Sequence, residues 1–195
     1  QSKISESKRK EVKNKYQLPK NYLLYVGSIE ERKNLLTLLK TIKEMPQQKL
    51  VIIGEGSVYK KKCIDYIKQN NISERVILLK GLKKDELASI YQEAEILIYP
   101  SIFEGFGIPI IESFSNGVPV ICSDLEVFKE IGKDSVLTFK RNDADDLASK
   151  MEFLIRFDNK RLELIQKGFQ RIKHFSTENF INSIETLFTS SNSNG

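Results

Sequence analysis

Six short apolar runs alternate with longer amphipathic stretches along most of the chain. The runs are rich in Val, Ile and Leu, show little polar alternation and are bounded by turn-forming residues, a pattern typical of βα units. Strands of this composition are expected to be buried on both faces, as in a parallel sheet. The predicted strands are residues 22–27, 49–54, 75–81, 95–100, 118–123 and 135–139. The predicted helices are residues 34–45, 57–70, 84–93, 109–116, 124–131 and 143–157.

This alternation predicts an α/β fold, a Rossmann-like doubly wound parallel sheet of about six strands with right-handed crossovers and C-terminal helices. Residues 1–20 are expected to form a leading helix or linker, and residues 176–189 a closing helix. The polar residues 190–195 are expected to be a disordered tail. No break in composition divides the chain, so residues 1–195 are predicted to form one domain. The start of the sequence lacks an initiator methionine, and we expect the chain to be a fragment of a longer protein.

The composition excludes several classes of function. The chain is 40% hydrophobic and 29% charged, and no apolar run approaches the roughly 18 residues of a membrane span, as expected for a globular cytoplasmic protein. Cys63 and Cys122 show no CxxC spacing and are predicted to be buried, reduced thiols. His174 is the single histidine, which leaves no basis for a histidine-dependent nucleophile or a histidine-bound metal.

The net charge of +5 is concentrated early, in residues 7–15 and again in residues 31–34. A basic excess can indicate nucleic acid, an anionic membrane surface or a phosphorylated ligand. The first run contains no interleaved aromatic residues, so we expect a solvated helix and no nucleic-acid partner. Peripheral contact of a larger protein with an anionic membrane is the other interpretation of this run.

Polar and glycine residues follow the predicted strands, at the edge where open α/β sheets bind ligands. The segment "GSIEERKN" after the first strand contains Gly27, which gives access to the backbone, and Arg32 and Lys33 just before a helix. Two cations beside a helix N-terminus suit a diphosphate. Solvation of an ordinary surface turn is the alternative interpretation.

The segment "GEGS" after the second strand does not complete a dinucleotide fingerprint. Such a fingerprint needs a glycine three residues after Gly56, where this chain has Tyr59, so a Rossmann dehydrogenase is disfavoured. Gly54 and Gly56 still permit a tight turn from strand to helix, and a purely structural role in that turn explains them equally well.

The segment "SIFEGFGIPIIES" follows the fourth strand and contains two glutamates, Glu104 and Glu112. Pro109 suits the first position of a helix, which places residues 105–108 in a loop whose amides can face a ligand. The two carboxylates then reach different parts of one ligand. A glycosidase-like pair of carboxylates is an alternative, disfavoured because aromatic sugar platforms are missing nearby and Trp is absent; a plain structural turn is another.

At this point the residues resemble a known family. The stretch "PSIFEGFGIPIIESFSNGVPVICSD" is similar to the E-x7-E signature of the retaining nucleotide-sugar glycosyltransferases of family 4. Glu104 and Glu112 match the two glutamates, and further similar segments extend in the same order over about residues 20–190. The resemblance implies the carboxyl-terminal, donor-binding half of a GT-B enzyme, with the N-terminal acceptor domain absent and residues 176–189 crossing back toward it.

Carried over by position, the resemblance implies that Arg32 and Lys33 neutralise the donor diphosphate and form the catalytic set with Glu104. Glu104 and the amides that follow it are expected to hold the transferred sugar and its phosphate, and Glu112 the ribose hydroxyls. Residues 80–82, which begin with Lys80, are expected to border the base. The expected donor-binding residues are Gly27, Arg32, Lys33, Gly81, Leu82, Glu104, Gly105, Phe106, Gly107, Ile108 and Glu112.

Ser28 departs from the family pattern, because many relatives have arginine directly after this glycine; Arg32 is the expected substitute. Loss of a nucleoside diphosphate builds negative charge on the β-phosphate, which fixed cations stabilise. The resemblance therefore implies a metal-independent hexosyltransferase with no cofactor. Glu104 is expected to orient and stabilise the donor and is not assigned as a nucleophile.

The implied reaction transfers a hexosyl group from a UDP- or GDP-sugar to a polysaccharide, lipopolysaccharide or glycolipid acceptor. The acceptor is expected to contact the missing N-terminal domain, so the fragment alone is expected to be inactive. A nucleotide-sugar epimerase of the same architecture and a catalytically silent sugar-nucleotide-binding partner are the alternatives. The enzyme is expected in the cytoplasm, with membrane association at the cytoplasmic face as a further option.

Overall fold

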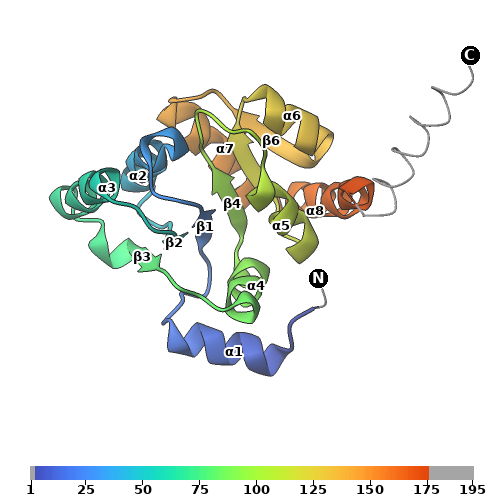
Figure 1. Ribbon diagram of the computed structural model, residues 1–195, viewed down its shortest axis with the longest axis horizontal. Helices are drawn as coiled ribbons and strands as arrows, with labels where there is room; N and C mark the ends of the chain where they lie inside the picture. Colours follow the sequence, from blue (N-terminus) through green and yellow to red (C-terminus); the bar gives the residue numbers. More distant parts are fainter. Residues whose placement is uncertain (1–2, 176–195) are drawn as a thin grey trace, which may run out of the picture.

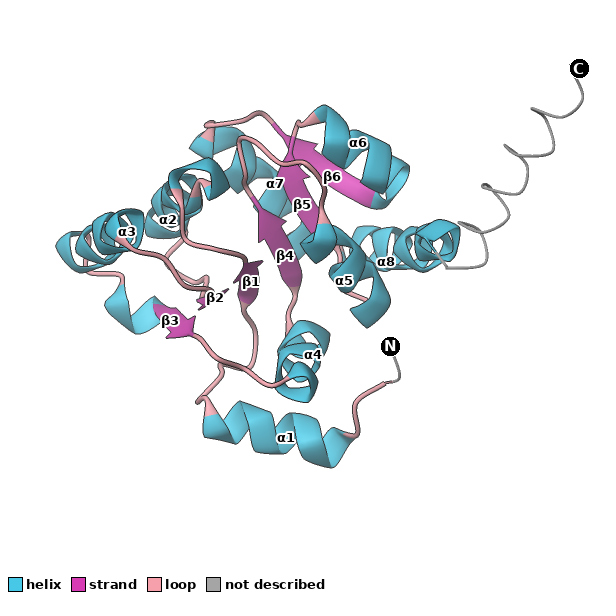
Figure 2. Cartoon of the chain, in the orientation of Figure 1, coloured by secondary structure: helices cyan, strands magenta, loops and turns pink. Residues whose placement is uncertain are grey.

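A six-stranded parallel sheet forms the centre of the computed structural model, which describes residues 3–175 (Figure 1). The strand order is β3-β2-β1-β4-β5-β6, and helices surround the strands (Figure 2). The strands are β1 (Leu23–Val26), β2 (Leu50–Ile53), β3 (Val76–Leu79), β4 (Ile96–Tyr99), β5 (Val120–Ser123) and β6 (Val136–Phe139). Each lies within one of the predicted strands, and the predicted fold class is confirmed.

The order of strands reverses direction between β1 and β4, which are hydrogen-bonded neighbours. From β1 the chain moves outward to β2 and β3, then crosses back to β4 and continues to β5 and β6. In open α/β sheets such a switch point leaves a crevice beyond the carboxyl ends of the two central strands. The segments that follow β1 and β4 are therefore placed together by the topology alone.

Helices cover both faces of the sheet because successive strand residues point to opposite sides. Leu23 and Tyr25 of β1 belong to one core cluster, whereas Leu24 belongs to the other. The first cluster packs against α2 (Leu35–Glu44), α3 (Val58–Gln69) and α7 (Ala144–Arg156). The second packs against α1 (Glu6–Lys15), α4 (Lys84–Glu93), α5 (Ile108–Asn116) and α6 (Glu126–Gly132). The helix α8 (Asp158–Ile172) contacts α5 and α7.

Short 3₁₀ turns lie in three of the connections, η1 (Glu31–Lys33), η2 (Ser73–Arg75) and η3 (Lys133–Ser135), and a fourth, η4 (Lys173–Phe175), follows α8. The helix α5 begins at Ile108, so Pro109 occupies the second helical position and not the predicted first. Pro is tolerated throughout this first turn, because the backbone N–H groups there have no partner within the helix.

The early basic run forms the predicted helix, but its cations are not simply solvated. The helix α1 lies against α4 (Figure 1), and four of its basic side chains form ion pairs with acidic residues of that helix. Arg9 Nη1 lies 2.6 Å from Glu93 Oε1, and Lys15 Nζ lies 2.6 Å from Glu86 Oε1. The basic run therefore attaches α1 to α4, which corrects the expectation that its cations are simply solvated.

Both cysteines are buried and unpaired, as predicted. Within residues 3–175, no helix is long and apolar enough to cross a membrane. The predicted closing helix over 176–189 and the predicted tail over 190–195 lie outside the described residues.

Candidate active site

The loop after β1 is fixed by glycines in the neighbouring strand connection. Gly27 has a φ of +152°, and its N–H donates to Ile53 O at 3.0 Å, while Ile29 N donates to Glu55 O at 2.7 Å. A Cβ added to Gly54 would lie 2.0 Å from Gly27 O, and one added to Gly56 would lie 2.2 Å from Ile29 O. The glycines of "GEGS" therefore let the loop after β1 pack closely against the loop after β2, which supports a structural role for them.

Asn34 joins this loop to the segment after β4. It has a left-handed conformation (φ 54°, ψ 37°) between η1 and α2, a region that Asn tolerates better than most residues. Its amide Nδ2 donates to Pro100 O at 3.1 Å and to Asn142 Oδ1 at 3.2 Å. Ile102 N also donates to Arg32 O at 2.8 Å. These bonds bring the cations of η1 next to the segment that contains Glu104.

Arg32, Lys33 and Tyr99 converge on the Glu104 carboxylate. Lys33 Nζ lies 2.5 Å from Glu104 Oε1, and Arg32 Nη1 lies 3.1 Å from Oε2. The Tyr99 hydroxyl donates to Oε1 at 2.9 Å and accepts a hydrogen bond from Lys33 Nζ at 3.0 Å. The Glu104 and Lys33 side chains are only 8% and 10% exposed, whereas that of Arg32 is 44% exposed. The site thus combines an internal ion pair with one exposed cation.

The surroundings of Glu104 keep its carboxylate ionised. Burial alone would raise the pKa of Glu104, but hydrogen bonds from donors that include Lys33 and Tyr99 outweigh this effect, and the pKa is lowered. Burial raises the pKa of the Tyr99 hydroxyl, which is therefore protonated and able to donate. A carboxylate bound in this way accepts hydrogen bonds and is poorly suited to serve as a general acid.

The residues after Glu104 form an open loop that leads into α5. Gly105 is exposed, and no neighbouring heavy atom lies within 4 Å of a Cβ built there. Phe106 and Ile108 are 49% and 62% exposed. Gly107 precedes the helix as its N-cap and is buried against Ile110 and Ile131. The loop therefore presents backbone and apolar side chains beside the cation cluster.

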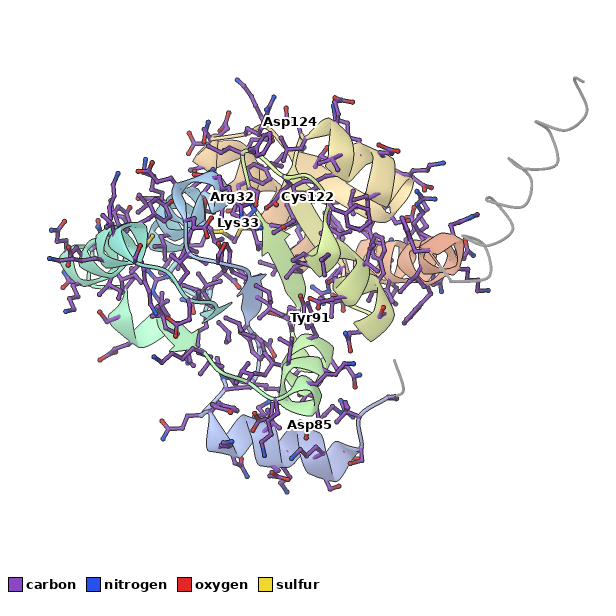
Figure 3. The ribbon with its side chains drawn as sticks, in the orientation of Figure 1. Arg32, Lys33, Asp85, Tyr91, Cys122 and Asp124 are labelled. Atoms are coloured by element: carbon purple, nitrogen blue, oxygen red, sulfur yellow. The ribbon has the colours of Figure 1, made fainter. Side chains whose placement is uncertain are left out.

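Glu112 has a separate set of partners. Its Oε2 accepts a hydrogen bond from the Tyr91 hydroxyl at 2.9 Å, and it lines a cavity of about 60 Å³ between α4 and α5 together with Lys84 and Leu87. Figure 3 shows Arg32 and Lys33 near the ends of the central strands and Tyr91 away from them, on α4. The structure does not join the two glutamates in one hydrogen-bonded pair.

The segment after β3 lies beside the segment after β2. Lys80 Nζ lies 3.3 Å from Glu55 Oε1, and both side chains are exposed. Gly81 has a φ of +63°, which favours glycine, and Leu82 packs against the second core cluster. Ser28 contributes its carbonyl, which accepts a hydrogen bond from the Tyr25 hydroxyl at 3.0 Å.

Sequence reasoning missed Tyr99, Tyr91 and Asn34. Tyr99 ends a predicted strand at its carboxyl edge, and that position was the available signal for its role. Tyr91 lies in a helix whose pattern predicts only core packing. Asn34 was indistinguishable from an ordinary residue at the start of a helix.

Within residues 3–175, no group of three or more histidine, cysteine, aspartate or glutamate side chains is placed to hold a metal ion. A hollow of about 620 Å³ between α2 and α3 is lined by none of the predicted site residues.

Residues 6–171 match the protein family described as "Glycosyl transferases group 1". The chain belongs to this family. It is 33% identical over 172 residues to the O-antigen chain mannosyltransferase B of Escherichia coli, an alignment that covers 85% of this chain and 45% of that protein. The chain spans about half the length of the curated relatives it matches.

Two solved structures illustrate the shared fold of this glycosyltransferase domain. The C-terminal domain of the glycosyl transferase group 1 protein LpcC from Francisella tularensis has a TM-score of 0.73 and 21% identity, covering 88% of this chain and 93% of that one. Anabaena HepE in complex with UDP and glucose has a TM-score of 0.82 and 18% identity, covering 97% of this chain and 53% of that one. At these identities the likeness concerns the fold.

Proposed function

We propose that the chain is the donor-binding, carboxyl-terminal domain of a retaining GT-B glycosyltransferase of family 4. In this proposal the enzyme transfers a hexosyl group from a UDP- or GDP-sugar to a polysaccharide, lipopolysaccharide or glycolipid acceptor in the cytoplasm. The observation that carries the proposal is the convergence of Arg32 and Lys33 on Glu104 at the switch point of the sheet. The names of relatives, which include O-antigen mannosyltransferases, support a mannosyl donor as the first to test.

The charges of the cluster suit a diphosphate. Arg32, Lys33 and Glu104 together carry a net charge of +1, and backbone amides of residues 105–108 lie at the start of α5. Negative charge grows on the β-phosphate as the glycosyl bond breaks, and fixed cations beside it lower the barrier without a metal ion. The exposed Arg32 is the cation best placed to leave Glu104 for the phosphate, which supports its role as substitute for the arginine missing at Ser28.

Glu104 serves in this proposal as an acceptor for sugar hydroxyls and as the anchor of Lys33. Its lowered pKa favours the ionised form that such contacts need. Glu112, held by Tyr91, is proposed to bind the ribose from its position between α4 and α5. The backbone of residues 80–82 is proposed to border the base.

A transfer assay on the full-length polypeptide tests the proposal. Glu104→Ala and Lys33→Ala are expected to lose turnover with GDP-mannose or another active sugar nucleotide while remaining folded. Lys43→Ala is the matched control, because the ion pair that Lys43 forms with Glu44 is exposed. Undiminished transfer in both site variants contradicts the site assignment, and conversion of the donor without any acceptor identifies an epimerase instead.

A further inference from the structure

Tyr99 is the last residue of β4 and is 1% exposed. Its ring packs against Phe128 with centroids 4.9 Å apart, and its hydroxyl emerges where Lys33 and Glu104 meet. The ammonium of Lys33 also lies 5.1 Å from the centre of the Tyr99 ring. A single tyrosine therefore touches both members of the ion pair.

The ionisation states fix the direction of each hydrogen bond in the triad formed by Lys33, Tyr99 and Glu104. A protonated lysine has only donors, so the Tyr99 oxygen accepts from Lys33. An ionised carboxylate has only acceptors, so the Tyr99 proton is directed to Glu104. The Lys33 ammonium donates two of its three N–H groups to Tyr99 and Glu104, and the third has no hydrogen-bond partner among residues 3–175.

Packing alone does not account for the hydroxyl. Phenylalanine would fill the same space against Phe128, and a buried hydroxyl costs free energy unless it is hydrogen-bonded. The two bonds to Lys33 and Glu104 offset that cost and bind the two ionic groups in one arrangement. Tyr22 provides the contrast, because its buried hydroxyl donates to the backbone carbonyl of Ile90 and touches no charged group of the site.

We propose that Tyr99 is a positioning residue that locks Lys33 and Glu104 together, so that the remaining N–H of Lys33 is directed to the donor diphosphate. This inference rests on the proposed function of the site. It divides the two cations by role: Lys33 is fixed by two partners in the interior, and Arg32, bonded to Glu104 and to exposed Glu30, is the cation that moves.

The test compares Tyr99→Phe with Tyr22→Phe in the full-length polypeptide. Each removes one buried hydroxyl, and only the first touches the triad. The first measurement is the pKa of Glu104, from a pH titration of side-chain carboxyl ¹³C signals assigned with Glu104→Gln. Tyr99→Phe is expected to raise this pKa by about 1 pH unit, because one hydrogen bond to the ionised form is lost, and Tyr22→Phe is expected to leave it unchanged.

The second measurement is calorimetric affinity for UDP and GDP. Tyr99→Phe is expected to weaken binding about 5- to 10-fold, the equivalent of one lost hydrogen bond, whereas Tyr22→Phe is expected to bind like the unmodified protein. An equal pKa of Glu104 in the two variants, or equal and measurable nucleotide affinities, overturns the positioning role. A protein that binds neither nucleotide contradicts the proposed function, and the titration still decides whether Tyr99 holds the pair.

A third protein keeps the test decisive if Tyr99→Phe does not fold. Incorporation of 3,5-difluorotyrosine at position 99 retains the ring and makes the hydroxyl a stronger donor. The pKa of Glu104 is then expected to fall, a shift opposite in sign to that of Tyr99→Phe. A rise or no change in this pKa overturns the proposed hydrogen bond.

Discussion

Lys33 Nζ lies 2.5 Å from Oε1 of Glu104, although the two residues are 71 positions apart in the sequence. The contact exists because β1 and β4 are neighbours in the sheet and because Asn34 bonds to the carbonyl of Pro100. Both side chains are nearly buried, so water cannot fully solvate either charge if its partner is removed. The ion pair therefore couples the stability of the domain to the proposed site.

Lys33→Met is predicted to destabilise the chain by about 2 to 3 kcal/mol at pH 7, because Glu104 loses its internal cation. Lys43→Met is the control from the same part of the chain, since the Lys43–Glu44 pair is exposed and is expected to contribute less than about 1 kcal/mol. Urea unfolding of both variants measures the two changes in free energy. Equal destabilisation in the two would show that the internal pair contributes no more than a surface pair.

Gly56→Ala is predicted to destabilise the domain by about 1 to 3 kcal/mol, because the new Cβ would overlap the backbone of the neighbouring loop. That Cβ would lie 2.2 Å from Ile29 O, in the loop that leads to Arg32 and Lys33. Gly105→Ala is the control, because no neighbouring heavy atom lies within 4 Å of its Cβ. Thermal unfolding measures both, and a Gly56→Ala protein as stable as Gly105→Ala contradicts the close approach of the two loops.

The attachment of α1 to α4 is predicted to weaken in acid through Glu86. Hydrogen bonds from the Lys15 side chain and the Lys83 backbone lower the pKa of Glu86 to about 2, against an ordinary value of about 4.3. Because the folded-state pKa is the lower one, this carboxylate contributes stability above about pH 4.3, and the contribution is lost as the pH falls toward 2.

Glu86→Gln removes this contribution, so its stability is predicted to fall less steeply than that of the unmodified chain between about pH 4.3 and 2. Glu126→Gln, on the exposed end of an ion pair with Lys129, is the matched control and should follow the unmodified profile. Chemical unfolding at a series of pH values gives the three curves. Parallel curves for Glu86→Gln and the unmodified chain would contradict the predicted contribution of the Glu86 carboxylate to the attachment of α1.

The fold was predictable because strands made of consecutive apolar residues need burial on both faces, and a parallel sheet covered by helices on both sides provides it. The meeting of Arg32, Lys33 and Glu104 was predictable for the same reason, since carboxyl ends of adjacent parallel strands share one edge. The roles of Tyr99 and Tyr91 were not, because a buried tyrosine hydroxyl and a core ring look alike in sequence. The ion pairs of α1 depend on the spatial position of α4, which local charge patterning does not reveal.

Calorimetric titration with UDP, GDP, ADP and the corresponding sugars tests most directly the claim that this edge of the sheet binds a nucleotide diphosphate. We predict measurable binding of at least one nucleotide to the unmodified chain and to Lys43→Met. It predicts affinity at least about 10-fold weaker for Lys33→Met, the loss of one charge-assisted contact. The absence of binding for every nucleotide, or equal affinity in Lys33→Met and Lys43→Met, would contradict the account.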